Sequence, residues 1–243
     1  MLLDHHPFVT RLSQFIKLNA SDFKSLEQII DGERKLKKRR DLVVDGGQYR
    51  NLCFVKSGYA IRSKLLRNGK RQILNVILPG DIIGFNVSFF DRAIYSVIAL
   101  SELTFNVCSL ESYVDLCFRR PQFGLALSWL AVQEAAMYAE HIVDIGRRTP
   151  VERLAHFLLE LHFRMLAVGG AGKTSVELPF SQEVIADVLG LSVPHLNRVM
   201  QQLRREKLIS GRARVVEFLD IGGLQTLAQF QPLKIAPIPL PRK

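Results

Sequence analysis

The chain has 243 residues, 48% of them hydrophobic, and carries a formal net charge of +10. This size and composition predict two modest globular domains, each with its own core, and exclude a chain that is disordered throughout. No run approaches the roughly 18 apolar residues of a membrane helix, and the first residues do not form a secretory leader. Three widely spaced cysteines do not suit a disulfide framework. We therefore expect a cytoplasmic protein without a membrane partner.

The N-terminal half changes from helical to β-type patterning. A helix is expected over residues 20–30, and the basic run 34–40 is interpreted as a solvated segment that leads into a strand rather than as a nucleic-acid patch. Short β-type runs then follow one another, separated by glycine-containing turns, and the last of them cover residues 94–99 and 104–110. Several short strands at this spacing predict a small barrel or roll.

The clearest hairpin in this region pairs residues 59–66 with residues 71–78. Asn68 and Gly69 lie between the two runs and suit a type I′ turn, in which both central residues take positive φ angles.

Helical spacing returns near residue 111, and residues 122–145 predict a helix of about six turns that could join two domains. Its apolar positions do not keep a clean heptad, because Glu134 and His141 fall where a coiled-coil seam needs apolar groups. Dimerisation through this helix is therefore a hypothesis that the pattern leaves open.

A new helix begins at the segment that follows. Thr149 is a suitable N-cap, Pro150 occupies the first helical position, and Glu152 stands three residues after the cap, which together form a capping box. The helix is expected to continue to about Met165 and to end in the glycine-rich segment 168–173.

Residues 181–208 have the pattern of a helix-turn-helix DNA reader. Ser181 is the expected N-cap of a first helix, and Gly190 follows the last apolar residue of that helix, where a left-handed backbone favours glycine. Ser192 is expected to cap a second helix, the recognition helix at about residues 193–206, which has Pro194 in its first turn.

The outer face of the second helix is rich in hydrogen-bond donors suited to base edges and phosphates. Residues 209–218 add a predicted hairpin, or wing, and the chain after Gly146 has 14 basic against 8 acidic residues, as a polyanion partner would favour. The alternative is a plain helical hairpin whose polar residues form a solvated face. The residues predicted to contact DNA are Ser181, Gln182, Ser192, Pro194, His195, Asn197, Arg198, Gln201, Arg212 and Arg214.

This order of parts resembles the Crp/Fnr superfamily of bacterial transcription regulators, most specifically in residues 78–84, 146–155 and 189–193. The resemblance implies an α+β fold and a homodimer that inserts one recognition helix per half-site into the major groove of a near-palindromic operator under the control of a signal to the roll. An activator of this kind would also contact RNA polymerase. The implied parts are a cyclic-nucleotide-binding-like β-roll at 8–110, a connecting and dimerisation helix at 111–147, a winged helix-turn-helix at 148–230, and a tail at 231–243 predicted to be disordered.

The resemblance also places an effector pocket in the roll, at Gly84, Phe85, Asn86, Tyr95 and Ser96. Family members that bind cyclic AMP hold its ribose with a glutamate and its phosphate with an Arg-Ser pair, whereas these positions look like Phe85, Tyr95 and Ser96 in this chain. An aromatic ring cannot replace the carboxylate, and tyrosine cannot replace the bidentate arginine, so the sequence argues against cyclic AMP. A roll without any ligand, in a dimer that is constitutively competent, is a further alternative.

The sequence predicts no cofactor and no metal site. No cysteine precedes Cys53, which excludes the N-terminal iron-sulfur cluster of the family's oxygen sensors. Haem and cysteine oxidation stay open as alternatives, although the cysteines are interpreted first as small buried hydrophobic residues. The candidate groups for these two alternatives are His5, His6, Cys53, Cys108 and Cys117.

The predicted function is therefore a DNA-binding transcription regulator and not an enzyme, since the sequence has no phosphate-binding glycine loop, metal-ligand spacing or Ser/His/Asp arrangement. Many family members carry a glutamate where this chain has Pro194, so its operator is expected to differ from the usual half-sites. Arg198 stands at the family's arginine position, and its predicted role is a bidentate bond to guanine. The alternative function is an effector-binding module that acts through protein contacts and has a degenerate DNA-binding domain.

Overall fold

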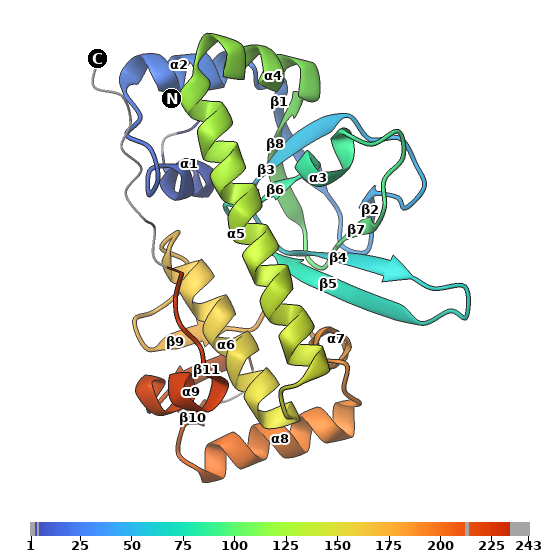
Figure 1. Ribbon diagram of the computed structural model, residues 1–243, viewed down its shortest axis with the longest axis vertical. Helices are drawn as coiled ribbons and strands as arrows, with labels where there is room; N and C mark the ends of the chain where they lie inside the picture. Colours follow the sequence, from blue (N-terminus) through green and yellow to red (C-terminus); the bar gives the residue numbers. More distant parts are fainter. Residues whose placement is uncertain (1–2, 4, 212–213, 234–243) are drawn as a thin grey trace.

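The structure is a computed structural model that describes residues 3, 5–211 and 214–233. The long helix α5 (Pro121–Gly146) runs through the molecule from the N-terminal helices to the helix-turn-helix, and a β-roll lies against its side (Figure 1). No helix in these described ranges is both long and apolar enough to cross a membrane.

Three short helices gather at the N-terminal end of α5. They are α1 (Pro7–Leu12), α2 (Ala20–Gln28) and α4 (Leu110–Arg119). Helix α2 confirms the helix expected over 20–30, and it begins at a capping box formed by Asn19 and Asp22. These helices share one apolar core with α5, in which Phe8 stacks on Phe54 with ring centroids 4.3 Å apart.

The roll consists of antiparallel strands in two four-stranded sheets, ordered β1-β8-β3-β6 and β2-β7-β4-β5 in the described part of the chain. The basic run 34–40 does not merely precede a strand, because its first residues belong to β1 and pair with β8. A short helix, α3 (Phe85–Ser88), follows β6. The strands are β1 (Gly32–Leu36), β2 (Asp41–Val43), β3 (Asn51–Ser57), β4 (Ala60–Leu65), β5 (Arg71–Ile77), β6 (Ile82–Ile83), β7 (Ser96–Ala99) and β8 (Leu103–Ser109).

The expected hairpin is β4 with β5, but the expected type I′ turn is wrong. Gly69 has a φ of 78°, whereas Asn68 is not among the residues with positive φ. The amide of Gly69 donates to the carbonyl of Leu66 at 2.9 Å, and the amide of Leu66 donates to the carbonyl of Lys70 at 2.8 Å. Three residues, 67–69, therefore separate the paired residues Leu66 and Lys70, where a type I′ turn would have two. A loop of this length is a type I turn followed by one left-handed residue.

The C-terminal part holds α6 (Pro150–Leu166), and the expected capping box of Thr149 and Glu152 is present at its start. One apolar core joins α6 and the helices after it to Ile61 and Ile73 of the roll, so the two parts do not have the separate cores expected from composition. The remaining elements are β9 (Ser175–Glu177), α7 (Gln182–Leu189), α8 (Val193–Arg205), β10 (Ile209–Ser210), β11 (Val215–Phe218) and α9 (Ile221–Ala228), with the strands in the order β10-β11-β9.

Candidate nucleic-acid interface and effector pocket

The helix-turn-helix is defined by local caps, as the sequence predicts. The hydroxyl of Ser181 accepts a hydrogen bond from the amide of Val184 at the start of α7. Gly190 ends α7 with φ 65° and ψ 35°, a left-handed conformation, and its amide donates to the carbonyl of Ala186. Arg153 on α6 donates to the carbonyl of Leu189, so the turn is fastened to the rest of the domain.

Helix α8 buries one apolar stripe, formed by Leu196, Val199 and Leu203, and turns its polar residues outward. Pro194 lies in its first turn, as expected. Ser192 has the extended backbone of an N-cap, but its hydroxyl makes no capping hydrogen bond, so the expected side-chain cap is absent. The exposed hydroxyl therefore has its hydrogen-bonding groups free for another partner.

Half of the residues predicted to contact DNA belong to α8, which forms one end of the molecule (Figure 1). His195 and Asn197 are half-buried, and Asn197 donates to the side-chain oxygen of Gln182 at 3.3 Å, which ties α8 to the start of α7. Arg214 is exposed just before β11, whereas Arg212 lies outside the described residues. The other predicted contacts, all exposed, are Ser181, Gln182, Ser192, Pro194, Arg198 and Gln201.

A buried arginine in the roll was not identified as a site residue from the sequence. Arg62 on β4 is only 2% exposed, and its guanidinium forms an ion pair with Glu134 on α5 and donates to the hydroxyl of Tyr138. The same guanidinium lies over the ring of Tyr95, with its central carbon 4.7 Å from the ring centroid. The sequence contains little signal for this site, because β4 also contains the polar residues Ser63 and Lys64.

Glu134 connects α5 to several parts of the roll. Its Oε2 accepts from the side-chain amide of Asn86 at 2.7 Å, and its Oε1 accepts from that of Asn75 at 3.4 Å as well as pairing with Arg62. Glu134 and His141 therefore face inward, since His141 binds Glu160 of α6. The heptad pattern that these two polar residues interrupt lies on the side of α5 that faces the rest of the protomer. It does not lie on the exposed side.

The residues expected to form an effector pocket do not fit a cyclic nucleotide. Tyr95 is buried beneath Arg62, and the hydroxyl of Ser96 accepts from the amide of Asp45 at 3.0 Å. The cation that lies over Tyr95 is Arg62, and Glu134 is already paired with it. The position therefore offers a phosphate no uncompensated positive charge and a ribose no free carboxylate.

The other predicted pocket residues have structural roles. Gly84 has a φ of 105°, and a Cβ there would lie 2.0 Å from the carbonyl oxygen of Asn51, so only glycine suits this close approach. Phe85 packs edge-on against Phe89, and Asn86 is engaged by Glu134. These contacts lock the start of α3 in place.

Cys53 and Cys108 are buried, and Cys117 is half-buried. Burial raises the pKa of Cys53 and of Cys108 to about 12 each, and it also raises the pKa of the half-buried Cys117. The thiolate is both the nucleophile and the metal ligand, so a raised pKa disfavours oxidation and haem ligation at these thiols. His6 is also engaged, because its Nδ1 accepts from the amide of Phe8 and caps α1.

We therefore expect peroxide to leave operator binding unchanged. The purified protein, treated with peroxide and then freed of it, should bind DNA with the affinity of untreated protein in a fluorescence anisotropy titration. A loss of affinity that a thiol reductant reverses would show that one of the cysteines is a redox switch.

The outer side of α5 carries an exposed stripe of apolar and small residues. Val132 is 67% exposed and Ile142 is 72% exposed. The stripe follows the alternating three- and four-residue spacing of a coiled-coil seam. It is offset by two residues from the inward-facing positions, which include Leu127, Leu130 and Glu134. Its members are Leu125, Ser128, Val132, Ala135, Ala139 and Ile142.

Comparisons with known proteins give matches for both the N-terminal and the C-terminal part of the chain. Residues 33–120 match the family model of the cyclic nucleotide-binding domain, and residues 152–227 match that of the Crp-like helix-turn-helix domain. The chain is 35% identical over 165 residues to the nitrogen fixation regulation protein FixK of Bradyrhizobium diazoefficiens, which covers 68% of each chain. It is 33% identical over 187 residues to FixK of Rhizobium meliloti, covering 74% of this chain and 80% of that one.

The structural similarity extends over both parts. The solved structure of FixK2 from Bradyrhizobium japonicum superposes with a TM-score of 0.73 at 25% identity, covering 81% of this chain and 96% of that chain. The transcriptional activator protein FnrA of Stutzerimonas stutzeri is 29% identical in sequence over 215 residues, covering 88% of this chain and 87% of that one.

Proposed function

The chain belongs to the Crp/Fnr family of DNA-binding transcription regulators, and we propose that it binds a near-palindromic operator as a homodimer, with α8 of each protomer in the major groove. The observation that carries this proposal is the exposed, donor-bearing face of α8 at one end of the molecule. Arg198 and Gln201 are exposed on that face, as residues that read base edges must be.

The proposed operator contact is divided between base reading and phosphate binding. We assign base reading to Arg198, with Asn197 and Gln201 beside it, and phosphate binding to Ser181 and Arg214. The boundaries 8–110, 111–147 and 148–230 for roll, connecting helix and DNA-binding domain are part of the proposal. The spans of the two matching family models support this division.

The homodimer is proposed from the exposed stripe on α5. Apolar side chains as exposed as Val132 and Ile142 gain free energy when a second copy of the same helix covers them. A two-fold axis along such a seam makes the contact self-complementary and presents two copies of α8 to two half-sites. RNA polymerase is proposed as a further partner in the case of activation.

The function is tested by selecting operators from random duplexes, with the purified protein and no added ligand. We expect a palindromic motif to be enriched, and we expect binding to weaken as salt is raised, because phosphate contacts release counterions. The opposite result is that the protein retains duplexes in a salt-sensitive way and that these duplexes share no common motif. That result would contradict sequence-specific binding.

Arg198→Ala is expected to cost about 1–3 kcal/mol on the selected operator and to relax the preference at one base pair, since a bidentate contact to guanine would be lost. Anisotropy titrations with the operator and with single-base variants measure both effects. Arg119→Ala is the matched control, because Arg119 lies exposed on α4 at the opposite end of the molecule. An equal loss on every duplex would assign Arg198 to phosphate binding.

A further inference from the structure

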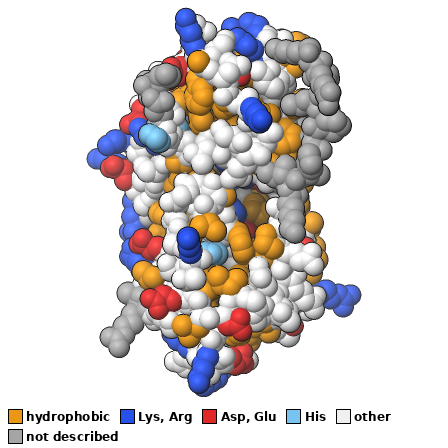
Figure 2. Space-filling view, turned by 90° about the vertical axis from the view of Figure 1, so that its left-hand side faces the viewer, with side chains coloured by type: hydrophobic (Ala, Val, Ile, Leu, Met, Phe, Trp, Pro, Cys, Tyr) orange, Lys and Arg blue, Asp and Glu red, His pale blue; other side chains and the backbone are white. Residues whose placement is uncertain are grey.

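A cavity of about 540 Å³ lies between α1, the β5–β6 turn of the roll, α5, α6 and residues 229–233. Figure 2 shows this face of the molecule hollowed at mid-height, with apolar side chains beside the opening. The volume is within the range of about 300–1,000 Å³ that small-molecule sites have. Of the residues predicted for the effector pocket, Phe85 lines this cavity, whereas Tyr95 lies in the core of the roll.

The walls of the cavity are apolar and partly aromatic. Leu130 and Met137 line it from α5, and Phe163 lines it from α6. Phe230 stacks on Phe163 with ring centroids 5.6 Å apart, so two aromatic rings form one wall. Such walls favour a ligand with an apolar body, because burial of its surface removes it from water.

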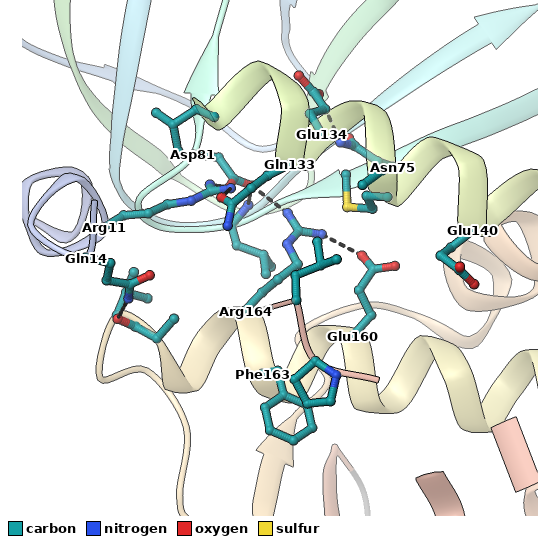
Figure 3. Close-up of a pocket in the computed structure, with 18 of the residues that line it drawn as sticks. Arg11, Gln14, Asn75, Asp81, Gln133, Glu134, Glu140, Glu160, Phe163 and Arg164 are labelled. Carbon is teal, nitrogen blue, oxygen red and sulfur yellow. Dashed lines mark hydrogen bonds and ion pairs between the residues drawn. The ribbon is translucent and has the colours of Figure 1, made fainter. Parts of the chain in front are cut away.

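One end of the cavity is strongly polar. Arg11 from α1 and Arg164 from α6 both point toward Asp81 and pair with that single carboxylate (Figure 3). Arg164 also binds Glu160 at 2.9 Å. Arg11 has a weaker second contact, since its other terminal nitrogen lies 3.5 Å from the side-chain oxygen of Gln133. Among the described residues, Asp81 is the only anion paired with Arg11, and Arg164 shares it.

The carboxylates of Asp81 and Glu160 at this end are surrounded by Arg11, Arg164 and His141. Glu160 also accepts from His141 at 2.6 Å. Burial alone would raise the pKa of Glu160, but its bonds to His141 and Arg164 lower it to about 2, and the same bond to Glu160 outweighs burial and raises the pKa of His141. Two more carboxylates line the cavity, and each is already paired with an arginine: Glu134 with Arg62, and Glu140 with Arg148. Burial lowers the pKa of Arg11, as expected for a cation that is incompletely compensated.

A buried acceptor is available at the roll end of the cavity. Asn75 is 3% exposed and lines the cavity, and in the described part of the chain its Oδ1 has no hydrogen-bond partner. A buried carbonyl without a donor costs free energy, which a donor group on a ligand would recover.

We propose that this cavity binds a small organic anion, with an aromatic or aliphatic body between Met137 and the rings of Phe163 and Phe230 and an anionic group on Arg11. A carboxylate or sulfonate there would give Arg11 an anion that it does not share with Arg164. The ligand would touch the roll, α5 and α6 at once, and therefore bind best to one arrangement of these parts. An effect of the ligand on operator binding would rest on the function proposed above. The proposal that the cavity binds a ligand does not depend on that function.

The site is tested with two dyes of similar shape. Anilinonaphthalene sulfonate is a fluorescent aromatic anion, and N-phenylnaphthylamine is its uncharged parent. We expect the full chain to bind one sulfonate per protomer, about tenfold more tightly than the neutral dye, and to melt at a higher temperature when the sulfonate is present, because the ligand binds the folded state. A sulfonate that lowers the melting temperature binds unfolded chain, which would overturn the proposal.

Two variants separate the anionic contact from the apolar one. Arg11→Gln is expected to abolish the tenfold preference for the sulfonate while the neutral dye still binds. Met137→Trp is expected to weaken binding of both dyes, because the larger ring takes up part of the space that the dyes would occupy beside Met137. Arg67→Gln and Phe118→Trp are the controls, since both residues are exposed and neither lines the cavity. Unchanged dye binding in Met137→Trp would show that the dyes bind elsewhere, and a preference retained in Arg11→Gln would overturn the anionic contact. Neither result depends on DNA binding.

Discussion

Arg62→Ala is expected to lower the free energy of unfolding by about 3–5 kcal/mol, the cost of removing one partner from a buried ion pair. Arg62 is 2% exposed, and its removal leaves the carboxylate of Glu134 in the interface between the roll and α5 without its cation. The amide groups of Asn75 and Asn86 remain as donors to that carboxylate, but neither carries a charge. Denaturant unfolding of the single variant, followed by the fluorescence of Trp129, measures the loss.

The double variant Arg62→Met/Glu134→Met is the control for this prediction. Replacing both charges by apolar side chains of similar length removes the unpaired carboxylate, so most of the lost stability should return. A double variant as unstable as the single one would show that packing against Tyr95, rather than charge pairing, makes Arg62 necessary. Cyclic AMP is expected to change neither the melting temperature nor the operator affinity of the wild-type chain, because Tyr95 and Ser96 replace the Arg-Ser pair that binds its phosphate in the family.

The helix-turn-helix could be predicted because its signals are local. Ser181 and Gly190 define the ends of α7 through contacts within four residues of each, and both act as expected. The hairpin turn is the opposite case. Asn68 and Gly69 suit two turn types, and the choice between them depends on how many residues separate paired positions of β4 and β5, which is a property of the register.

The ion pair of Arg62 and Glu134 could not be predicted, since it joins residues 72 positions apart that only the completed fold brings together. The same limit explains the position of Arg11, which reaches Asp81 across 70 positions of sequence. A charged residue that is buried needs a partner, but the sequence shows neither that Arg62 is buried nor which residue pairs with it.

The sequence left dimerisation through α5 open for a different reason, namely that α5 is apolar on more than one side. Leu127 and Leu130 belong to the buried side, which packs on the N-terminal helices. The register that includes them contains Glu134 and His141, and for that reason the heptad looked broken. Once the buried side is known, Val132 and Ile142 are left as a second, uninterrupted register.

Val132→Glu/Ile142→Glu is therefore expected to convert the proposed homodimer into a monomer and to weaken operator binding by about 10²–10⁴-fold, the range by which two linked contacts exceed one. In a two-fold seam each glutamate meets its own copy, so like charges replace apolar contacts without any change inside the protomer. Sedimentation and anisotropy measure the two effects. Phe118→Glu is the matched control, since it places the same charge on an apolar residue that is 81% exposed but lies on α4. A variant that remains dimeric would move the interface away from α5, whereas a monomer with undiminished affinity would mean that one copy of α8 suffices for the operator.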